Sequence, residues 1–140
     1  VAVVTGANSG IGAETVKSLA NAGYEVVMAC RDVAKGEEVR RQLLEAVGRD
    51  HHGAAGRLTV SELDLSSLDS VRRFAASFAE SHPQCDLLVN NAGVMMIPEL
   101  RRTHDGFEEQ WGVNYLAHYH LTSCLLPNLL RSPSARIVNV

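Results

Sequence analysis

Apolar runs and helical patterns alternate along the 140-residue chain. Short continuous apolar runs are typical of buried strands, and apolar residues repeated every three to four positions are typical of amphipathic helices. The expected strands are Val1–Thr5, Glu25–Cys30, Arg57–Leu63, Asp86–Asn90 and Arg136–Val140. Because helical patterns separate them, we expect βαβ units and therefore one α/β domain over residues 1–140, with a doubly wound parallel sheet.

Four helices are expected between these strands: Gly10–Ala22, Val33 to about Val47, a helix opened by Ser66, and Phe107 to about Leu130. Ser66 stands three residues before Asp69, which resembles a capping box, and Asp32 is suited to cap the second helix. Pro127 should kink or fray the last helix. The glycine-rich stretch Gly48–Gly56 is expected to be a surface loop.

Composition narrows the class of protein without identifying it. Hydrophobic residues make up 46% and charged residues 21% of the chain, which is ordinary for a soluble globular domain, and a net charge of -3 gives no reason to expect nucleic acid as a partner. Three widely spaced cysteines favour a reducing, intracellular compartment over a disulfide framework. The histidines indicate no metal site, since His51 and His52 are adjacent in a loop and His118 and His120, two apart, would not share a helix face.

The stretch TGANSGIG, Thr5 to Gly12, follows the first strand and opens the first helix. A helix start presents unpaired N–H groups and a partial positive charge, and glycines let a phosphate approach the backbone. Gly6, Gly10 and Gly12 do not have the G-x-G-x-x-G spacing of the commonest dinucleotide fingerprint, and no Lys-Ser/Thr pair follows as in a Walker loop. A turn without a ligand remains one interpretation, and the pyrophosphate of a dinucleotide, in a Rossmann-type domain, is the favoured one.

Four motifs carry a resemblance to a known family. They are T-G-x-x-x-G-I-G after the first strand, Asp64-Leu65 after the third, N-N-A-G (Asn90–Gly93) after the fourth, and Asn114 in the long helix. In this order they resemble the short-chain dehydrogenase/reductase family. The sequence segments ACRD, NNAGVMM, DGFE and VNYLAHYHLT are similar to those of the retinol-dehydrogenase-like branch. Members of that branch act on lipid alcohols and ketones such as retinoids, sterols or polyprenols.

The resemblance implies roles for the residues that match. Gly6, Ser9, Gly10, Ile11 and Gly12 of the glycine loop would surround the pyrophosphate and adenosine ribose of the cofactor. Asp64 and Leu65 would contact its adenine. Asn90, Ala92 and Gly93 would line the ribose side at the end of the fourth strand. Two alternatives stay open. Asp64 is also suited to cap the next helix, and Asn90-Asn91 to form a turn that ties the central strands together.

The end of the second strand bears on the choice between NADP(H) and NAD(H). An acidic residue there would pair with a ribose 2′-hydroxyl, whereas a cation accepts a 2′-phosphate. NAD-preferring relatives carry the acid at the last strand position, which here is the neutral Cys30, and Arg31 follows. We therefore expect NADP(H) to be preferred, with NAD(H) possible, and interpret Asp32 as a helix cap.

The resemblance also implies the chemistry, in which hydride transfer interconverts an alcohol and a carbonyl. The family uses a Tyr with a Lys four residues later, a Ser after the fifth strand, and an Asn that positions the Lys through water; Asn114 matches the last. An Asn inside a helix is otherwise a buried hydrogen-bonding group that pins the helix. Tyr24, Tyr115 and Tyr119 have no Lys four residues on.

We therefore expect the chain to carry the cofactor-binding half, without the catalytic Ser, the Tyr-x-x-x-Lys pair and the C-terminal elements of the fold, and to be inactive alone. The alternative is a non-catalytic dinucleotide-binding or interaction module. Expected partners are a lipophilic alcohol or ketone and, through the long helix, a second subunit. We expect Phe107, Trp111 and Tyr119 to be helix-packing residues. The longer protein is expected in the cytoplasm or on the cytosolic face of the endoplasmic reticulum, where membrane association is possible.

Overall fold

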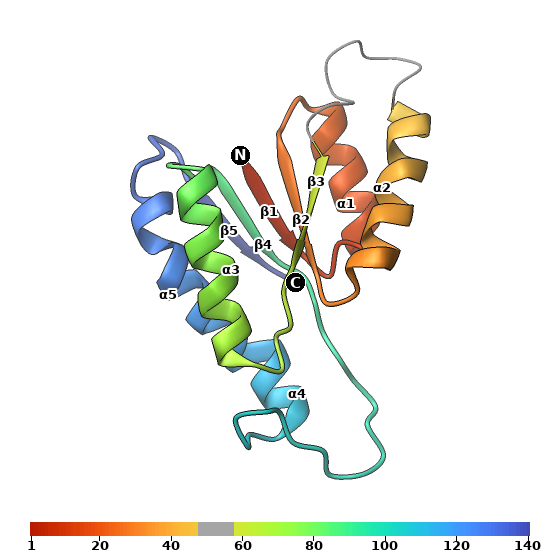
Figure 1. The fold of residues 1–140 in the computed structure, drawn as a ribbon, viewed down its shortest axis with the longest axis vertical. Coiled ribbons are helices and arrows are strands. Elements are labelled where there is room, and N and C mark those ends of the chain that lie inside the picture. Colours follow the sequence, from red (N-terminus) through yellow and green to blue (C-terminus); the bar gives the residue numbers. More distant parts are fainter. Residues whose placement is uncertain (48–57) are drawn as a thin grey trace.

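A computed structural model of the chain describes residues 1–47 and 58–140. Its core is a parallel sheet with strand order β3-β2-β1-β4-β5 (Figure 1). The strands are β1 (Ala2–Thr5), β2 (Val26–Cys30), β3 (Leu58–Glu62), β4 (Leu87–Asn90) and β5 (Arg136–Asn139). The predicted α/β fold is therefore confirmed, and the loop expected over Gly48–Gly56 lies outside the described residues.

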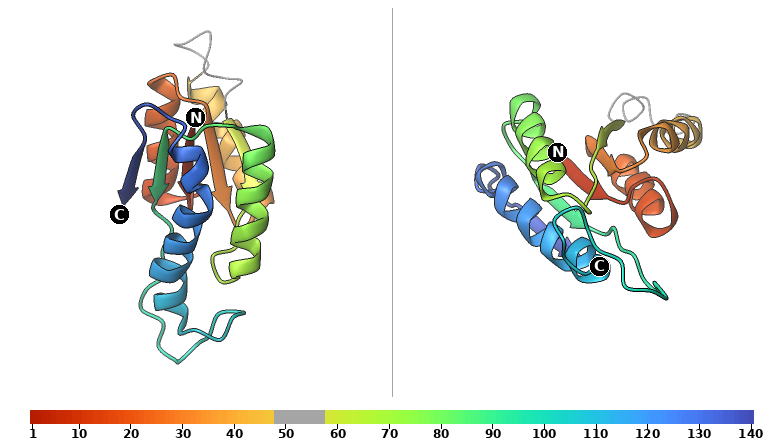
Figure 2. Two further views of the ribbon diagram at one scale, coloured as in Figure 1. Left: turned by 90° about the vertical axis from the view of Figure 1, so that its left-hand side faces the viewer. Right: turned by 60° about the horizontal axis from the view of Figure 1, so that its bottom comes forward.

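Helices cover both faces of the sheet (Figure 2). The helical segments are α1 (Gly10–Asn21), α2 (Val33–Val47), α3 (Leu68–Ser81), α4 (Glu109–Trp111), the π-helical turn η1 (Gly112–Leu116) and α5 (Ala117–Leu129). Alternate residues of one strand serve opposite layers: Val3 packs with α3 and α5, whereas Ala2 and Val4 pack with α1 and α2. Continuous apolar strands such as β1 are needed because the sheet is buried on both faces.

The caps of α2 and α3 follow the same chemistry but only one was predicted at the right residue. Asp32 Oδ1 accepts a hydrogen bond from Lys35 N at 2.9 Å, which confirms the expected cap of α2. For α3 the cap is Ser67, whose Oγ accepts from Ser70 N at 3.2 Å, and the helix begins at Leu68. The prediction that Ser66 opens this helix was therefore wrong by one residue.

The long helix departs from the single continuous element that was expected. It begins at Glu109 and not at Phe107, because both carboxylate oxygens of Glu108 accept backbone N–H groups of the first turn. These bonds hold the pKa of Glu108 below its usual value. In η1 the helix widens to a π-helical turn, with Ala117 N bonded to Gly112 O, before α5 continues through Pro127 to Leu129.

The outer side of this helix carries aromatic rings. Phe107 and Trp111 lie 5.4 Å apart by ring centroids, and Trp111 and Tyr115 lie 6.0 Å apart. Phe107 and Trp111 therefore contact each other, but both rings are exposed, so they are not packed into the core. Tyr119 is 65% exposed, and the expected packing role was wrong for it. At the nearby sheet edge all four residues of β5 are exposed. Of the helices described, none combines the length and apolar character that crossing a bilayer requires.

Candidate functional site

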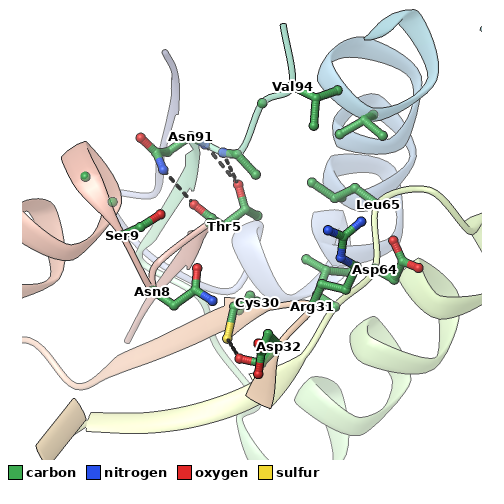
Figure 3. Close-up of a pocket in the computed structure, with 18 of the residues that line it drawn as sticks. Thr5, Asn8, Ser9, Cys30, Arg31, Asp32, Asp64, Leu65, Asn91 and Val94 are labelled. Atoms are coloured by element: carbon green, nitrogen blue, oxygen red, sulfur yellow. Dashed lines mark hydrogen bonds between the residues drawn. The ribbon is translucent and has the colours of Figure 1, made fainter. Parts of the chain in front are cut away.

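A hollow of about 570 Å³ opens where the carboxyl ends of β1, β2, β3 and β4 meet (Figure 3). This edge of a parallel α/β sheet is the usual place for a ligand. The hollow gathers every predicted cofactor-binding residue except Asn90: Gly6, Ser9, Gly10, Ile11, Gly12, Arg31, Asp64, Leu65, Ala92 and Gly93. Segments far apart in the sequence thus contribute to one site.

Two glycines of the first loop serve different purposes. A Cβ on Gly12 would lie 2.2 Å from Gly6 O and 2.7 Å from Asn91 Nδ2, so only glycine lets α1 approach the end of β1. Gly10 has φ +52°, and a Cβ there would meet no atom within 4 Å. The backbone at Gly10 is therefore open to a large group.

The first turn of α1 presents its N–H groups to this hollow. Ser9 is the N-cap residue in an extended conformation, and its side chain makes no capping hydrogen bond. No acidic side chain lies in the first turn either. An anion seated here would therefore find backbone donors and the positive end of a twelve-residue helix.

The segment after β2 and the first turn of α2 supply positive side chains to the hollow. Arg31 and Lys35 both line it, and sequence reasoning had missed Lys35, although its place in the first turn of α2 is visible from the sequence. Asp32 is engaged as the cap of that turn. Burial, with smaller contributions from the carboxylates of Asp32 and Glu37, raises the pKa of Cys30 to about 11, so its thiol stays neutral.

Asp64 and Leu65 form the opposite wall. Asp64 Oδ1 accepts from Ser66 N at 2.9 Å, and Asp64 Oδ2 lies 3.7 Å from His104 Nε2. The carboxylate therefore shapes the turn that precedes α3, while Ser67 caps the helix itself. Figure 3 shows Asp64 and Leu65 across the hollow from Ser9.

The loop after β4 is tied to the end of β1. Asn91 Nδ2 donates to Thr5 O at 2.8 Å, and Thr5 Oγ1 accepts from the backbone N–H groups of Asn91 and Ala92 at 2.9 Å each (Figure 3). The turn that ties the central strands is thus built by Asn91. Asn91 also lines the hollow and was not among the predicted cofactor contacts.

Asn90 and Asn114 face a second hollow, of about 480 Å³, between α5 and the β4–β5 edge. Asn90 Nδ2 donates to Asn139 Oδ1 at 2.9 Å and to Thr122 Oγ1 at 3.3 Å, so it ties β4 to β5 and α5. Its buried Oδ1 has no hydrogen-bond partner among the residues that the structure describes. The structure therefore does not bring Asn90 together with the other predicted cofactor contacts.

Asn114 pins the helix to the loop after β4. Its Oδ1 accepts from Val94 N, and its Nδ2 donates to Val94 O, both at 2.8 Å. The pinning role that was left open is thus seen in the structure, although Asn114 is exposed and not buried as that alternative expected. As for metals, residues 1–47 and 58–140 contain no group of three His, Cys, Asp or Glu side chains placed to hold an ion.

The whole length of the chain is similar to known proteins. The family model for short chain dehydrogenases matches residues 1–140. Retinol dehydrogenase 11 of Homo sapiens is 48% identical over 140 residues, covering 100% of this chain and 42% of that protein. Retinol dehydrogenase 14 of Mus musculus is 46% identical over 142 residues, covering 99% of this chain and 42% of that protein.

Solved structures agree with these sequence relatives. A metagenomic short-chain oxidoreductase in complex with NADP superimposes with a TM-score of 0.79 at 33% identity, over 98% of this chain and 58% of that one. Menthone neomenthol reductase from Mentha piperita gives a TM-score of 0.81 at 29% identity, over 97% and 58%. The chain spans less than half the length of the retinol dehydrogenases it matches. It belongs to the short-chain dehydrogenase/reductase family of oxidoreductases and is similar within it to the retinol dehydrogenases.

Proposed function

We propose that the protein is an NADP(H)-dependent oxidoreductase that interconverts a lipophilic alcohol and a carbonyl, and that this chain binds the cofactor. The observation that carries the proposal is the pairing, in one hollow, of an uncapped helix start with two cations. Relatives named retinol dehydrogenases support a retinoid-like substrate, and a relative solved with NADP supports the cofactor.

The residues around the hollow fit a dinucleotide. The open backbone at Gly10 and the first turn of α1 would hold the pyrophosphate, with Gly6, Ser9, Ile11 and Gly12 around it. The wall formed by Asp64 and Leu65 would take adenine, because a carboxylate accepts from its amino group and Leu65 offers an apolar side chain. The bound cofactor supplies the hydride.

The preference for NADP(H) rests on charge at the end of β2. A 2′-phosphate would lie near Arg31 and Lys35, and a guanidinium matches a phosphate dianion well. The neutral Cys30 adds no repulsion. Asp32 already serves as a helix cap, which weakens its case as the acceptor of an NAD ribose hydroxyl.

The nicotinamide side and the partners belong to the same proposal. Ala92 and Gly93 would line the ribose, and Asn114 would position the proton-transferring groups of the active site. Asn90 would act from the second hollow, by fixing the end of β4. The exposed aromatic side of the long helix, which includes Tyr119, supports a homodimer.

The test is a titration of the purified protein with NADPH and NADH, followed by cofactor fluorescence. We expect NADPH to bind more tightly. Arg31→Asp should weaken NADPH binding by about ten- to a hundredfold, the effect of losing a charge-assisted contact, and shift preference toward NADH. Arg41→Asp is the matched control, since Arg41 is exposed on α2 and outside the hollow. Equal affinity of the unaltered protein for both cofactors would contradict the assignment.

A further inference from the structure

His118 is a buried histidine that the proposed function does not use. It lies on the first turn of α5 and is 5% exposed. Its Nε2 is 2.9 Å from Thr5 Oγ1, and its Nδ1 is 3.0 Å from Asn114 O. Both ring nitrogens therefore have defined partners, one from the end of β1 and one from the π-helical turn.

The partners determine where the imidazole proton lies. Thr5 Oγ1 already accepts from Asn91 N and Ala92 N, so its two lone pairs are occupied. Its own proton must be donated, and His118 Nε2 at 2.9 Å is a far better acceptor than Val89 O at 3.5 Å. Nε2 is then the unprotonated nitrogen.

The other side of the ring follows by the same reasoning. A carbonyl only accepts, so the contact between His118 Nδ1 and Asn114 O requires a proton on Nδ1. The ring is therefore neutral and in the Nδ1–H form. Burial favours the same state, because it lowers the pKa of His118, an effect partly offset by the hydrogen bond to the Asn114 carbonyl.

These hydrogen bonds form a closed network. Thr5 Oγ1 accepts from the N–H groups of Asn91 and Ala92, and the Asn114 side chain bonds both backbone polar groups of Val94. His118 is hydrogen-bonded to both Thr5 and Asn114. The segment held this way, residues 91–94, is one wall of the cofactor hollow. The contact between Thr5 and His118 also joins β1 to α5 across 113 positions of sequence.

We infer that His118 is a positioning residue which, in its Nδ1–H form, links Thr5 to Asn114 and so fixes residues 91–94 against the cofactor. The inference rests on the proposed function for the identity of that cofactor. The hydrogen bonds of His118 do not involve the cofactor, so they can be tested separately from the cofactor's identity.

The first test is the tautomer in the unaltered protein, which needs no variant. Imidazole ¹⁵N shifts of the purified protein at pH 7 should show a protonated Nδ1 and an unprotonated Nε2 for His118. A protonated Nε2, as the other tautomer or as imidazolium, would overturn the inference.

The second test is amide exchange in variants. His118→Phe keeps the ring volume and removes both contacts, so the amides of Ala92 and Val94 should exchange faster, while those within β1 and β2 do not change. Uniform acceleration would indicate general destabilisation and overturn a positioning role. His120→Phe, two residues along the same helix and outside both hollows, is the control and should leave Ala92 and Val94 as they were.

The third test is cofactor affinity. We expect His118→Phe to raise the Kd for NADPH about tenfold, as for the loss of one or two neutral hydrogen bonds. His118→Asn keeps a donor near the Nδ1 position and should recover part of the loss. Wild-type binding with an unchanged Kd in His118→Phe would overturn the inference alone. Failure of the wild type to bind NADPH, with the tautomer and exchange results as expected, would overturn only the proposed function.

Discussion

The two hollows lie on either side of β4 and are made of different material. The first is lined by glycines, a helix start and the ends of four strands, together with charged side chains such as Arg31, Lys35 and Asp64. The second is lined by side-chain amides, hydroxyls and rings from η1, α5 and the β4–β5 edge, including Asn114, Tyr115 and Thr122. The first resembles an anion site, and the second offers hydrogen-bonding groups without a cation. Binding and chemistry are therefore expected to separate between them.

The largest effect expected from this difference is a complete separation of binding from turnover. We predict that the 140-residue chain binds NADPH but has no measurable dehydrogenase activity, because none of its tyrosines has a lysine four residues later to lower the pKa of a phenol. The measurement is NADPH consumption with a panel of retinoid-like aldehydes, beside the binding titration. Turnover by the chain would show that the second hollow carries chemistry of its own.

The next effect tests the backbone construction of the first hollow. Gly12→Ala should destabilise the fold by more than about 4 kcal/mol, since its Cβ would overlap Gly6 O, which is backbone and has no room to move. Gly10→Ala should cost only about 1 kcal/mol for its positive φ and still fold. Urea unfolding separates the two variants, and NADPH titration should show weaker binding by the folded Gly10→Ala protein. Equal stability of both variants would contradict the close approach at Gly12.

Lowering the pH should reduce the free energy of unfolding through His118, which lies between the two hollows. His118 has a lowered pKa in the folded state, whereas an unfolded histidine takes up its proton near pH 6.5. The unfolded state therefore binds more protons as pH falls below about 6.5, and stability drops until the folded pKa is also passed. Urea unfolding at pH 7.5, 6.5 and 5.5 should show this loss in the wild type and a shallower loss in His118→Phe. Identical pH profiles would mean that His118 titrates alike in both states.

The smallest effect concerns the cap of α3, one residue beyond Ser66 in the lining of the first hollow. Ser67→Ala should destabilise the protein by about 1 kcal/mol, because it removes the cap of α3. Ser66→Ala is the matched control, since Ser66 serves Asp64 through its backbone N–H, which alanine retains. Thermal unfolding of the two variants measures the loss of stability. A larger loss in Ser66→Ala than in Ser67→Ala would indicate that Ser66 is the cap.

Periodicity and strand-end motifs predicted the fold and most of the first hollow, because both depend on local patterns. Errors arose where neighbours of the same type compete. Ser66 and Ser67 are equally suited to cap a helix, and Asn90 and Asn91 equally suited to end a strand. Only tertiary contacts assign them: Asn91 reaches Thr5, and Asn90 reaches β5.

The π-helical turn was not predictable for a related reason. Its residues Gly112–Leu116 carry no local signal for widening, such as a proline. Asn114, which contacts Val94, lies in this turn, and His118, which contacts Thr5, lies just after it in α5; both partners are distant in sequence. Lys35 is a different case, since it stands in the first turn of α2 and was overlooked beside Arg31.

The hydrogen bond between Thr5 and His118 can form only late in synthesis of the chain on the ribosome. A ribosome adds about 5 to 20 residues per second, so about 6 to 23 seconds separate the synthesis of these two residues. During that interval β1 can pair with β2, but its other side waits for β4, whose first pairing with β1 joins Ala2 to Leu87. The nascent chain therefore presents an unpaired edge of β1, with a row of free backbone N–H and C=O groups, until β4 has been made.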